Sequence, residues 1–208
     1  MPTVLDHILL GSSDLDEGIT FVNEHTGVTP VLGGVHPGRG TRNALLSLGE
    51  RHYLEIIAPD PAQPGSPDAY GLKKLAAPHL VSWAAHPGDL DGLAARLRNA
   101  GIGFDGPTPG ERKRPDGRFL RWKTLNLHDN QAGLLPFFIE WSADTVHPSA
   151  DAPSGCKILR FELSAPNDTE LQRLCTLLGL DVPITHGEKP RLLVRIAAPG
   201  GRLMALAS

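Results

Sequence analysis

The sequence predicts an α+β fold made of two paired β-α-β-β-β units, with a third, partial unit at the C-terminus. In two places a short apolar strand runs into a polar turn, the tripeptide Asp-Leu-Asp and an amphipathic helix closed by glycine, and strand-like segments follow each helix. A fixed order of elements that recurs along a chain is the sequence signature of a duplicated supersecondary unit. The 23 glycines and 19 prolines fall between apolar segments and mark the turns.

The first unit is predicted over residues 3–60. Its first strand is the apolar run 8–10, bounded by glycine and two serines, and Ser13 or Asp14 can cap the helix that follows over residues 14–25. Gly27 is a typical helix terminator. The unit ends with three candidate strands, at residues 28–32, 42–48 and 52–57.

The second unit is predicted over residues 78–142 and the third over residues 156–207. The second contains a strand at 79–84, a helix at 92–100 and strands at 119–127 and 135–141. The third contains a strand at 157–163, a helix at 169–178 and strands at 191–197 and 202–206, and is read as truncated. The proline-rich segment 58–67 is a linker between the first two units.

Composition excludes several classes of function. The net charge of -3 and pI near 6.3 give no overall basic field, so nucleic acid is a poor partner and a small molecule is favoured. No leader pattern and no apolar run of membrane-spanning length is present, which predicts a cytoplasmic protein without a membrane partner. Cys156 and Cys175 lack CxxC spacing and are expected to be free thiols.

His7 stands inside the first apolar strand. Because side chains alternate between the two faces of a sheet, this imidazole must either find a polar partner in the interior or face a cleft. Glu55 and Glu140 also interrupt apolar strands, where a lone carboxylate is costly unless it is paired, hydrogen-bonded or metal-bound. Both a structural role and a shared role in one cleft remain open for these residues.

These residues support a family resemblance. The chain resembles the vicinal oxygen chelate superfamily of glyoxalase I and the extradiol dioxygenases. The resemblance is carried by the repeated unit with His7 in its first strand, the run 53–56 around Glu55 and the run 138–141 around Glu140. Within it, residues 36–43 together with 53–60 are similar to the glyoxalase-like domain subgroup. The resemblance covers residues 3–142.

The resemblance implies a cleft in which a divalent metal, such as Zn, Ni, Fe or Mn, chelates two substrate oxygens. It implies His7, Glu55 and Glu140 as metal ligands and Glu55 or Glu140 as the catalytic base. The fourth ligand is missing, because the offset from the helix start places Ser82 at its position, and a hydroxyl is a poor ligand for these ions. A cleft without metal is therefore a real alternative.

Six further residues are predicted to contact the substrate: His36, Arg39, Asn43, Ser82, Arg121 and Trp122. The first three belong to a glycine-rich loop and the strand after it, where the backbone can approach a ligand closely. The last two belong to the basic hairpin 113–123, which is either a solvated sheet edge or a clamp for an anionic substrate.

Two functions follow from these observations. The first is a glyoxalase-like metalloenzyme, a lyase, isomerase or dioxygenase, acting on a small oxygenated molecule between the two units. The second is a metal-free protein that binds or sequesters a small molecule, like the drug-resistance members of the superfamily. Covalent catalysis is disfavoured because Ser82 lacks a Gly-x-Ser-x-Gly elbow. Homodimerisation, the substrate and the metal are left open by the sequence.

Overall fold

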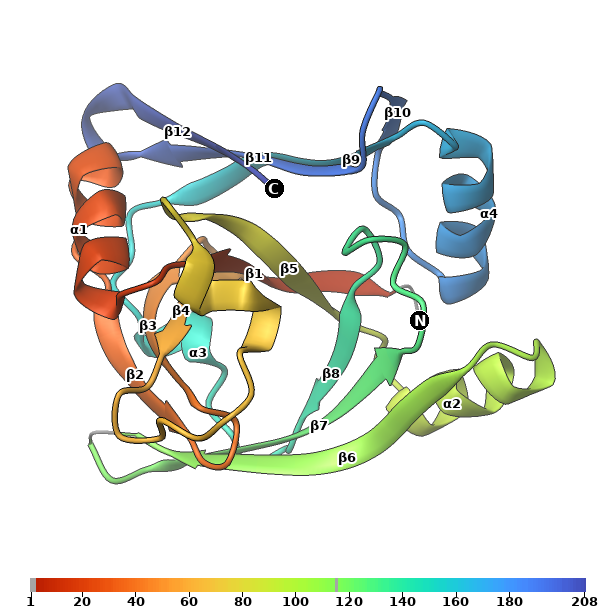
Figure 1. The fold of residues 1–208 in the computed structure, drawn as a ribbon, viewed down its shortest axis with the longest axis horizontal. Coiled ribbons are helices and arrows are strands. Elements are labelled where there is room, and N and C mark those ends of the chain that lie inside the picture. Colours follow the sequence, from red (N-terminus) through yellow and green to blue (C-terminus); the bar gives the residue numbers. More distant parts are fainter. Residues whose placement is uncertain (1–2, 115) are drawn as a thin grey trace.

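The computed structural model describes residues 3–114 and 116–208 (Figure 1). The first unit consists of β1 (Val4–Gly11), α1 (Leu15–Thr26), β2 (Val31–His36), β3 (Thr41–Ser47) and β4 (Tyr53–Pro59). The 3-10 helix η1 (Ala69–Lys74) lies in the connection to the second unit, which consists of β5 (His79–His86), α2 (Leu90–Asn99), β6 (Phe104–Lys113), β7 (Phe119–Leu127) and β8 (Phe137–Trp141). The two predicted β-α-β-β-β units are confirmed.

The eight strands of the two units form one curled sheet in the order β2-β3-β4-β1-β5-β8-β7-β6. In each unit the first strand pairs in parallel with the last, and β1 joins β5 antiparallel at the centre. The edge strands β2 and β6 approach each other, so that a Cβ atom at Gly34 of β2 would lie 3.1 Å from the carbonyl oxygen of Lys113 in β6. Gly34 also has a φ of +135°, which only glycine adopts readily.

Strand β6 was not predicted. It contains Pro107 and Pro109 with two glycines, a composition that argues against a central strand. It tolerates the prolines because it is an edge strand that pairs with β7 alone within the sheet.

The third unit consists of β9 (Lys157–Ala165), α4 (Asp168–Leu178), β10 (Ile184–His186), β11 (Arg191–Ala198) and β12 (Arg202–Ala207), with the 3-10 turn η2 (Pro199–Gly201) between the last two strands. The short helix α3 (Pro148–Asp151) precedes it. Its sheet has the order β10-β9-β11-β12, so β9 pairs in parallel with the three-residue β10 and not with the last strand. The C-terminal unit therefore repeats the element order of the other two but not their strand pairing.

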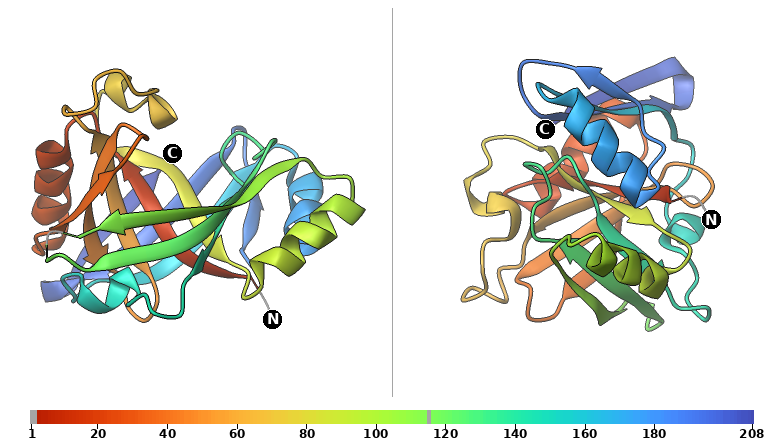
Figure 2. Two further views of the ribbon diagram at one scale, coloured as in Figure 1. Left: turned by 90° about the horizontal axis from the view of Figure 1, so that it is seen from below. Right: turned by 90° about the vertical axis from the view of Figure 1, so that its right-hand side faces the viewer.

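This second sheet covers the convex face of the first (Figure 2). Figure 1 shows α1 and α4 at the two ends of the C-terminal sheet, on either side of the space between the two sheets. Ile8, Trp83 and Phe161 belong to the shared core, where the Trp83 and Phe161 rings meet edge to face with centroids 4.9 Å apart. The Trp83 Nε1–H donates to the carbonyl of Leu134 at 2.9 Å, which satisfies the polar atom of this fully buried side chain.

Other local features follow the sequence pattern. The Asp14 carboxylate caps α1 by accepting from the backbone N–H of Asp16 and Glu17, and Gly27 ends the helix with a φ of 73°. Cys156 and Cys175 are free and buried, as predicted. Across the described residues, no helix combines the length and apolar character needed to cross a membrane.

Candidate functional site

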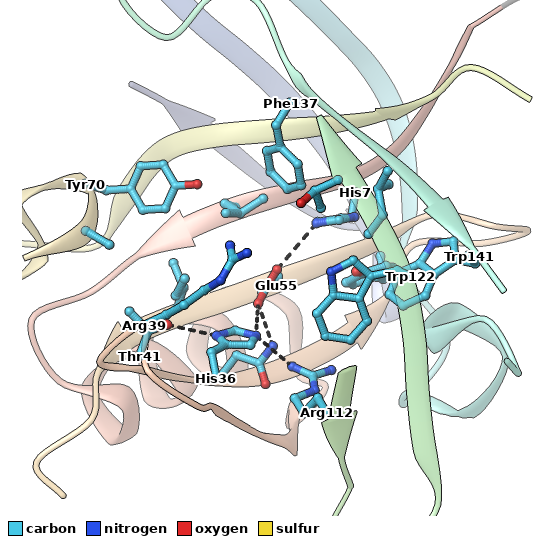
Figure 3. A pocket seen from close by; sticks show the side chains of 17 residues that line it. His7, His36, Arg39, Thr41, Glu55, Tyr70, Arg112, Trp122, Phe137 and Trp141 are labelled. Carbon is cyan, nitrogen blue, oxygen red and sulfur yellow. Dashed lines mark hydrogen bonds and ion pairs between the residues drawn. The ribbon is translucent and has the colours of Figure 1, made fainter. Parts of the chain in front are cut away.

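The concave face of the eight-stranded sheet holds a cavity of about 370 Å³ (Figure 3). Both units contribute to it, because alternate residues of β1, β3, β4, β7 and β8 point to this face. Its lining residues are His7, Leu9, His36, Arg39, Thr41, Asn43, Tyr53, Glu55, Ile57, Ala69, Tyr70, Arg112, Trp122, Thr124, Phe137, Ile139 and Trp141.

A bulge in β1 places two neighbouring polar side chains together. Leu5 pairs with Ala85 of β5 and His7 pairs with Ala84, so Asp6 is an extra residue without its own partner in this ladder. In a regular strand Asp6 and His7 would point to opposite faces of the sheet. With the bulge, the Asp6 Oδ1 and His7 Nδ1 atoms meet at 2.7 Å.

Asp6 is held behind the cavity wall by two further side chains. Its Oδ2 atom accepts from Trp141 Nε1 at 3.0 Å and lies 3.3 Å from His147 Nε2. Burial raises the pKa of Asp6, but the hydrogen bonds to His147 and His7 and the charges of both rings outweigh burial, so the pKa lies well below the usual range. Asp6 is thus a carboxylate that accepts the Nδ1 proton of His7, leaving His7 Nε2 toward the cavity.

Glu55 lies opposite His7 Nε2. The distance from its Oε2 atom to His7 Nε2 is 3.4 Å, its Oε1 atom lies 3.6 Å from His36 Nε2, and Oε1 also accepts from Asn43 Nδ2. Glu55 is only 7% exposed. Burial raises the pKa of Glu55. His36, His7, Arg112 and the Asn43 hydrogen bond together lower this pKa by more than burial raises it, so the net shift is downward.

His36 and Arg112 join the two edge strands. Arg112 Nη1 donates to His36 Nε2 across 3.1 Å, and His36 Nδ1 is 2.8 Å from Thr41 Oγ1, to which it donates. Burial lowers the pKa of His36 to about 4, so the ring is neutral at pH 7. Arg112, 4% exposed, is therefore a buried cation between a neutral imidazole and the negative charge of Glu55.

The structure brings six of the predicted site residues to the cavity: His7, His36, Arg39, Asn43, Glu55 and Trp122. The polar members cluster around Glu55, as Figure 3 shows, whereas Trp122 forms part of an apolar wall. Six of the residues named from the sequence thus line one cavity, and their roles in it stay predictions.

The prediction that Glu140 shares the cavity with Glu55 is wrong. Because side chains alternate along β8, the residues Phe137, Ile139 and Trp141 face the cavity and Glu140 faces the other side. There its Oε2 atom accepts from the backbone N–H of Leu90 at 2.8 Å, at the N-terminus of α2. Glu140 stabilises the start of a helix and is not available as a cavity base or ligand.

Two other predicted residues lie outside the lining. Arg121 is exposed and pairs with Asp144 at 3.1 Å and Glu111 at 3.5 Å, because its neighbour Trp122 takes the inward position on β7. The predicted anion clamp at Arg121 is therefore wrong. Ser82 is buried in β5 opposite Leu9 and does not line the cavity.

The strand register explains why the second unit lacks an acid–base group. Tyr53 of β4 pairs with His7, and Phe137 of β8 pairs with Ala84 in the same way. Ala84, and not Ser82 as the offset from the helix start predicted, is thus the structural counterpart of His7, and by the same count Ile139 is the counterpart of Glu55. The first unit supplies the carboxylate and the imidazoles of the cavity, and the second supplies most of its aromatic wall together with Arg112.

Sequence reasoning missed Asp6, Tyr53 and Arg112. The ring of Tyr53 stacks on His7 with centroids 4.4 Å apart and an interplanar angle of 17°, which holds the imidazole flat against the wall. Arg112 was missed because β6 was not recognised as a strand. Asp6 was missed because simple alternation places it on the opposite face from His7.

The cavity side chains do not fit a resident divalent metal. With Glu140 turned away, only His7 and Glu55 remain of the three implied ligands. His36 brings a third donor near, but its Nε2 lone pair already accepts from Arg112, whose fixed positive charge opposes a cation at that point. Within residues 3–114 and 116–208, no group of three or more His, Cys, Asp or Glu side chains is arranged to hold a metal ion.

Comparison with known proteins identifies the class. Residues 5–178 match the model of the glyoxalase-like domain, so the chain belongs to this family of the vicinal oxygen chelate superfamily. No match was found among curated proteins.

One solved structure shares the fold over nearly the whole chain, and two others are similar over part of it. A hypothetical protein from Staphylococcus aureus has a TM-score of 0.69 at 14% identity, over 98% of this chain and 85% of that one. Methylmalonyl-CoA epimerase from Mycobacterium tuberculosis has a TM-score of 0.47 at 26% identity, over 66% of this chain and 86% of that one. A methylmalonyl-CoA epimerase from Streptomyces coelicolor, in complex with 2-nitronate-propionyl-CoA, has a TM-score of 0.49 at 22% identity, over 70% of this chain and 99% of that one.

Proposed function

We propose that the protein is a glyoxalase-like isomerase or lyase that moves a proton on a carbon next to a carbonyl group of a small oxygenated molecule. The observation that carries this proposal is the 3.4 Å contact between Glu55 Oε2 and His7 Nε2 at the cavity wall. Both groups are held in place from behind, Glu55 by Asn43 and His7 by Asp6. A buried, positioned carboxylate–imidazole pair is the arrangement that general acid–base catalysis requires.

Glu55 is the base in this mechanism. Its lowered pKa keeps it ionised at neutral pH, so it accepts the proton as the C–H bond of the substrate breaks and the electron pair moves to the carbonyl oxygen. His7 Nε2 lies within reach of the same carboxylate, so it takes the proton from Glu55 and returns it at a second position of the substrate. An isomerisation balances in this way without any added reactant.

Arg112 stabilises the negative charge that develops on the substrate oxygen. It is a buried cation in the cavity lining, and its position is fixed by the hydrogen bond to His36. A preorganised donor of this kind contributes about 10²- to 10³-fold in rate. The same cation, together with the outward orientation of Glu140, favours this metal-independent reaction over the metal-dependent lyase or dioxygenase considered from the sequence.

Deuterium exchange tests the proposal. Wild-type protein is incubated in D2O with a panel of 2-oxo acids and α-hydroxy carbonyl compounds, and loss of the C–H signal is followed by proton NMR. We expect at least one compound to exchange. The Glu55→Gln variant should exchange it about 10²- to 10⁴-fold more slowly.

The matched control is Glu140→Gln, which alters a glutamate of the corresponding strand outside the cavity and should keep the exchange. Treatment of the wild type with EDTA should also leave the rate unchanged. Full activity of Glu55→Gln, or loss on EDTA treatment with recovery on adding a divalent metal, contradicts the proposal. Ligand binding without exchange of any panel member favours the metal-free binding protein instead.

A further inference from the structure

We propose that the substrate is a small aromatic carboxylate, with its ring against the second unit and its acidic group at Arg39. This inference rests on the proposed function, since it describes what the same cavity binds. Three observations support it: the balance of charge in the lining, the aromatic wall, and the position of Glu55 between them.

The lining carries one excess positive charge among its permanently charged side chains. Arg39 and Arg112 are the cations and Glu55 is the carboxylate, while Asp6 lies behind the wall. Burial lowers the pKa of the Arg112 guanidinium, and the charge of the nearby Glu55 partly opposes this shift. With Arg112 assigned to the oxygen that becomes negative during the reaction, the cation that remains for a separate acidic group of the ligand is Arg39.

Arg39 is placed to receive an anion from solvent. It is exposed near the cavity entrance, and Figure 3 shows its guanidinium reaching toward the interior on the Tyr70 side. Arg42, three residues later, lies 3.8 Å from Asp14, whereas Arg39 has no carboxylate within ion-pair distance in the part of the chain that the structure describes. A guanidinium of this kind binds a carboxylate through two parallel hydrogen bonds.

The opposite wall is aromatic. Trp122 and Trp141 meet edge to face with centroids 5.6 Å apart, and Phe137 meets His7 at 5.5 Å. The Trp122 ring packs against Gly110 of β6, where a Cβ atom would come within 2.7 Å of the Trp122 Nε1 atom. The absence of a side chain at Gly110 therefore gives the ring a defined position against the strand. Flat, preorganised aromatic walls favour flat apolar ligands through stacked and edge-to-face contacts.

Glu55 lies between these two regions. In Figure 3, Arg39 is on one side of its carboxylate and Trp122 is on the other. A ligand with its ring on the aromatic wall and its acidic group at Arg39 therefore presents the atoms between the two to Glu55 and His7. The volume of about 370 Å³ fits a single-ring compound of this kind.

Binding of three matched probes tests this inference without relying on turnover. Phenylacetate has the ring and the charge, 2-phenylethanol has the ring without the charge, and cyclohexylacetate has the charge without the aromatic ring. Isothermal titration calorimetry on the wild-type protein should show phenylacetate binding at least tenfold more tightly than 2-phenylethanol and severalfold more tightly than cyclohexylacetate. The advantage over the alcohol should shrink at high salt, because Arg39 is exposed.

Variants locate the contact. Arg39→Gln should weaken phenylacetate to the affinity of 2-phenylethanol and leave the alcohol unchanged, and Arg39→Lys should retain part of the difference. Arg42→Gln, the matched control, should bind phenylacetate like the wild type. Equal affinity for phenylacetate and 2-phenylethanol, or an unchanged phenylacetate affinity in Arg39→Gln, overturns the inference.

The outcome is separable from that of the proposed function. Glu55→Gln should still bind phenylacetate, because it removes a negative charge and leaves Arg39 and the aromatic wall in place. Deuterium exchange that depends on Glu55, without preference for phenylacetate, would reject the substrate class alone. Preference for phenylacetate with no role of Glu55 in exchange would reject the proposed chemistry alone.

Discussion

Asp6 and His7 are consecutive residues whose side chains contact each other, with Asp6 Oδ1 2.7 Å from His7 Nδ1, because a bulge interrupts the pairing of β1 with β5. This contact fixes which ring nitrogen of His7 carries the proton and which faces Glu55. It makes Asp6 a positioning residue that acts on the cavity without lining it.

Replacing Asp6 by Asn tests this role. The amide keeps the size of the side chain but removes the charge that holds the Nδ1 proton, so we expect proton exchange to fall about 10²- to 10⁴-fold. The pH profile of the remaining exchange should also shift, which a purely structural role would not cause. Ser149→Ala, which alters a partner of His147 only, is the control and should keep the wild-type profile.

His7→Gln separates function from folding. The sequence alone suggests a loss in free energy of unfolding of about 1 kcal/mol or less if no structural hydrogen bond is lost; the structure shows that His7 bonds to Asp6, so we expect about 1–3 kcal/mol. Exchange should be lost far beyond what partial unfolding explains. Urea denaturation and deuterium exchange on one preparation measure both. A variant that unfolds more easily but exchanges normally would make His7 structural.

His36 gives stability a specific pH dependence. The pKa of His36 is lowered by burial from 6.5 to about 4, so between these values the unfolded chain binds a proton that the folded chain does not. Its contribution is complete above pH 6.5 and is lost as the pH falls toward 4, by roughly 3 kcal/mol. Urea denaturation of wild type and His36→Gln between pH 7 and 4 should show a shallower decline for the variant. Parallel curves would refute this assignment.

Glu140→Gln should affect a helix and not the cavity. The carboxylate accepts from the Leu90 N–H at the positive end of α2, so its neutralisation should lower the free energy of unfolding by about 0.5–1.5 kcal/mol. Phenylacetate affinity should stay at the wild-type value. A marked loss of affinity without a change in stability would return Glu140 to the site.

The sequence revealed the duplicated fold because helix caps and strand periods are local signals. The resemblance to the vicinal oxygen chelate superfamily also implied that His7 and Glu55 share one cleft, and the structure brings them 3.4 Å apart. The prediction for Glu140 was wrong because the apolar-Glu-apolar pattern does not show which face of β8 points into the cavity. That depends on pairing with β5 and β7, which is a long-range property.

Arg112 and Asp6 show two other limits of sequence reasoning. Arg112 reaches the cavity from a proline-containing edge strand that resembles a loop in sequence. Asp6 joins His7 through a single bulge, which reverses the direction expected from alternation. Both features arise from how strands pair, and neither leaves a local pattern.

The correspondence of His7 with Ala84 and of Glu55 with Ile139 means that the two structurally equivalent units make different contributions to the cavity. The first half holds the proton-transfer pair, and the second half holds Arg112 and the aromatic wall that faces the substrate. Substitutions at Trp122, which contacts Trp141 and not His7, would therefore change which molecules are accepted while the proton-transfer pair stays intact.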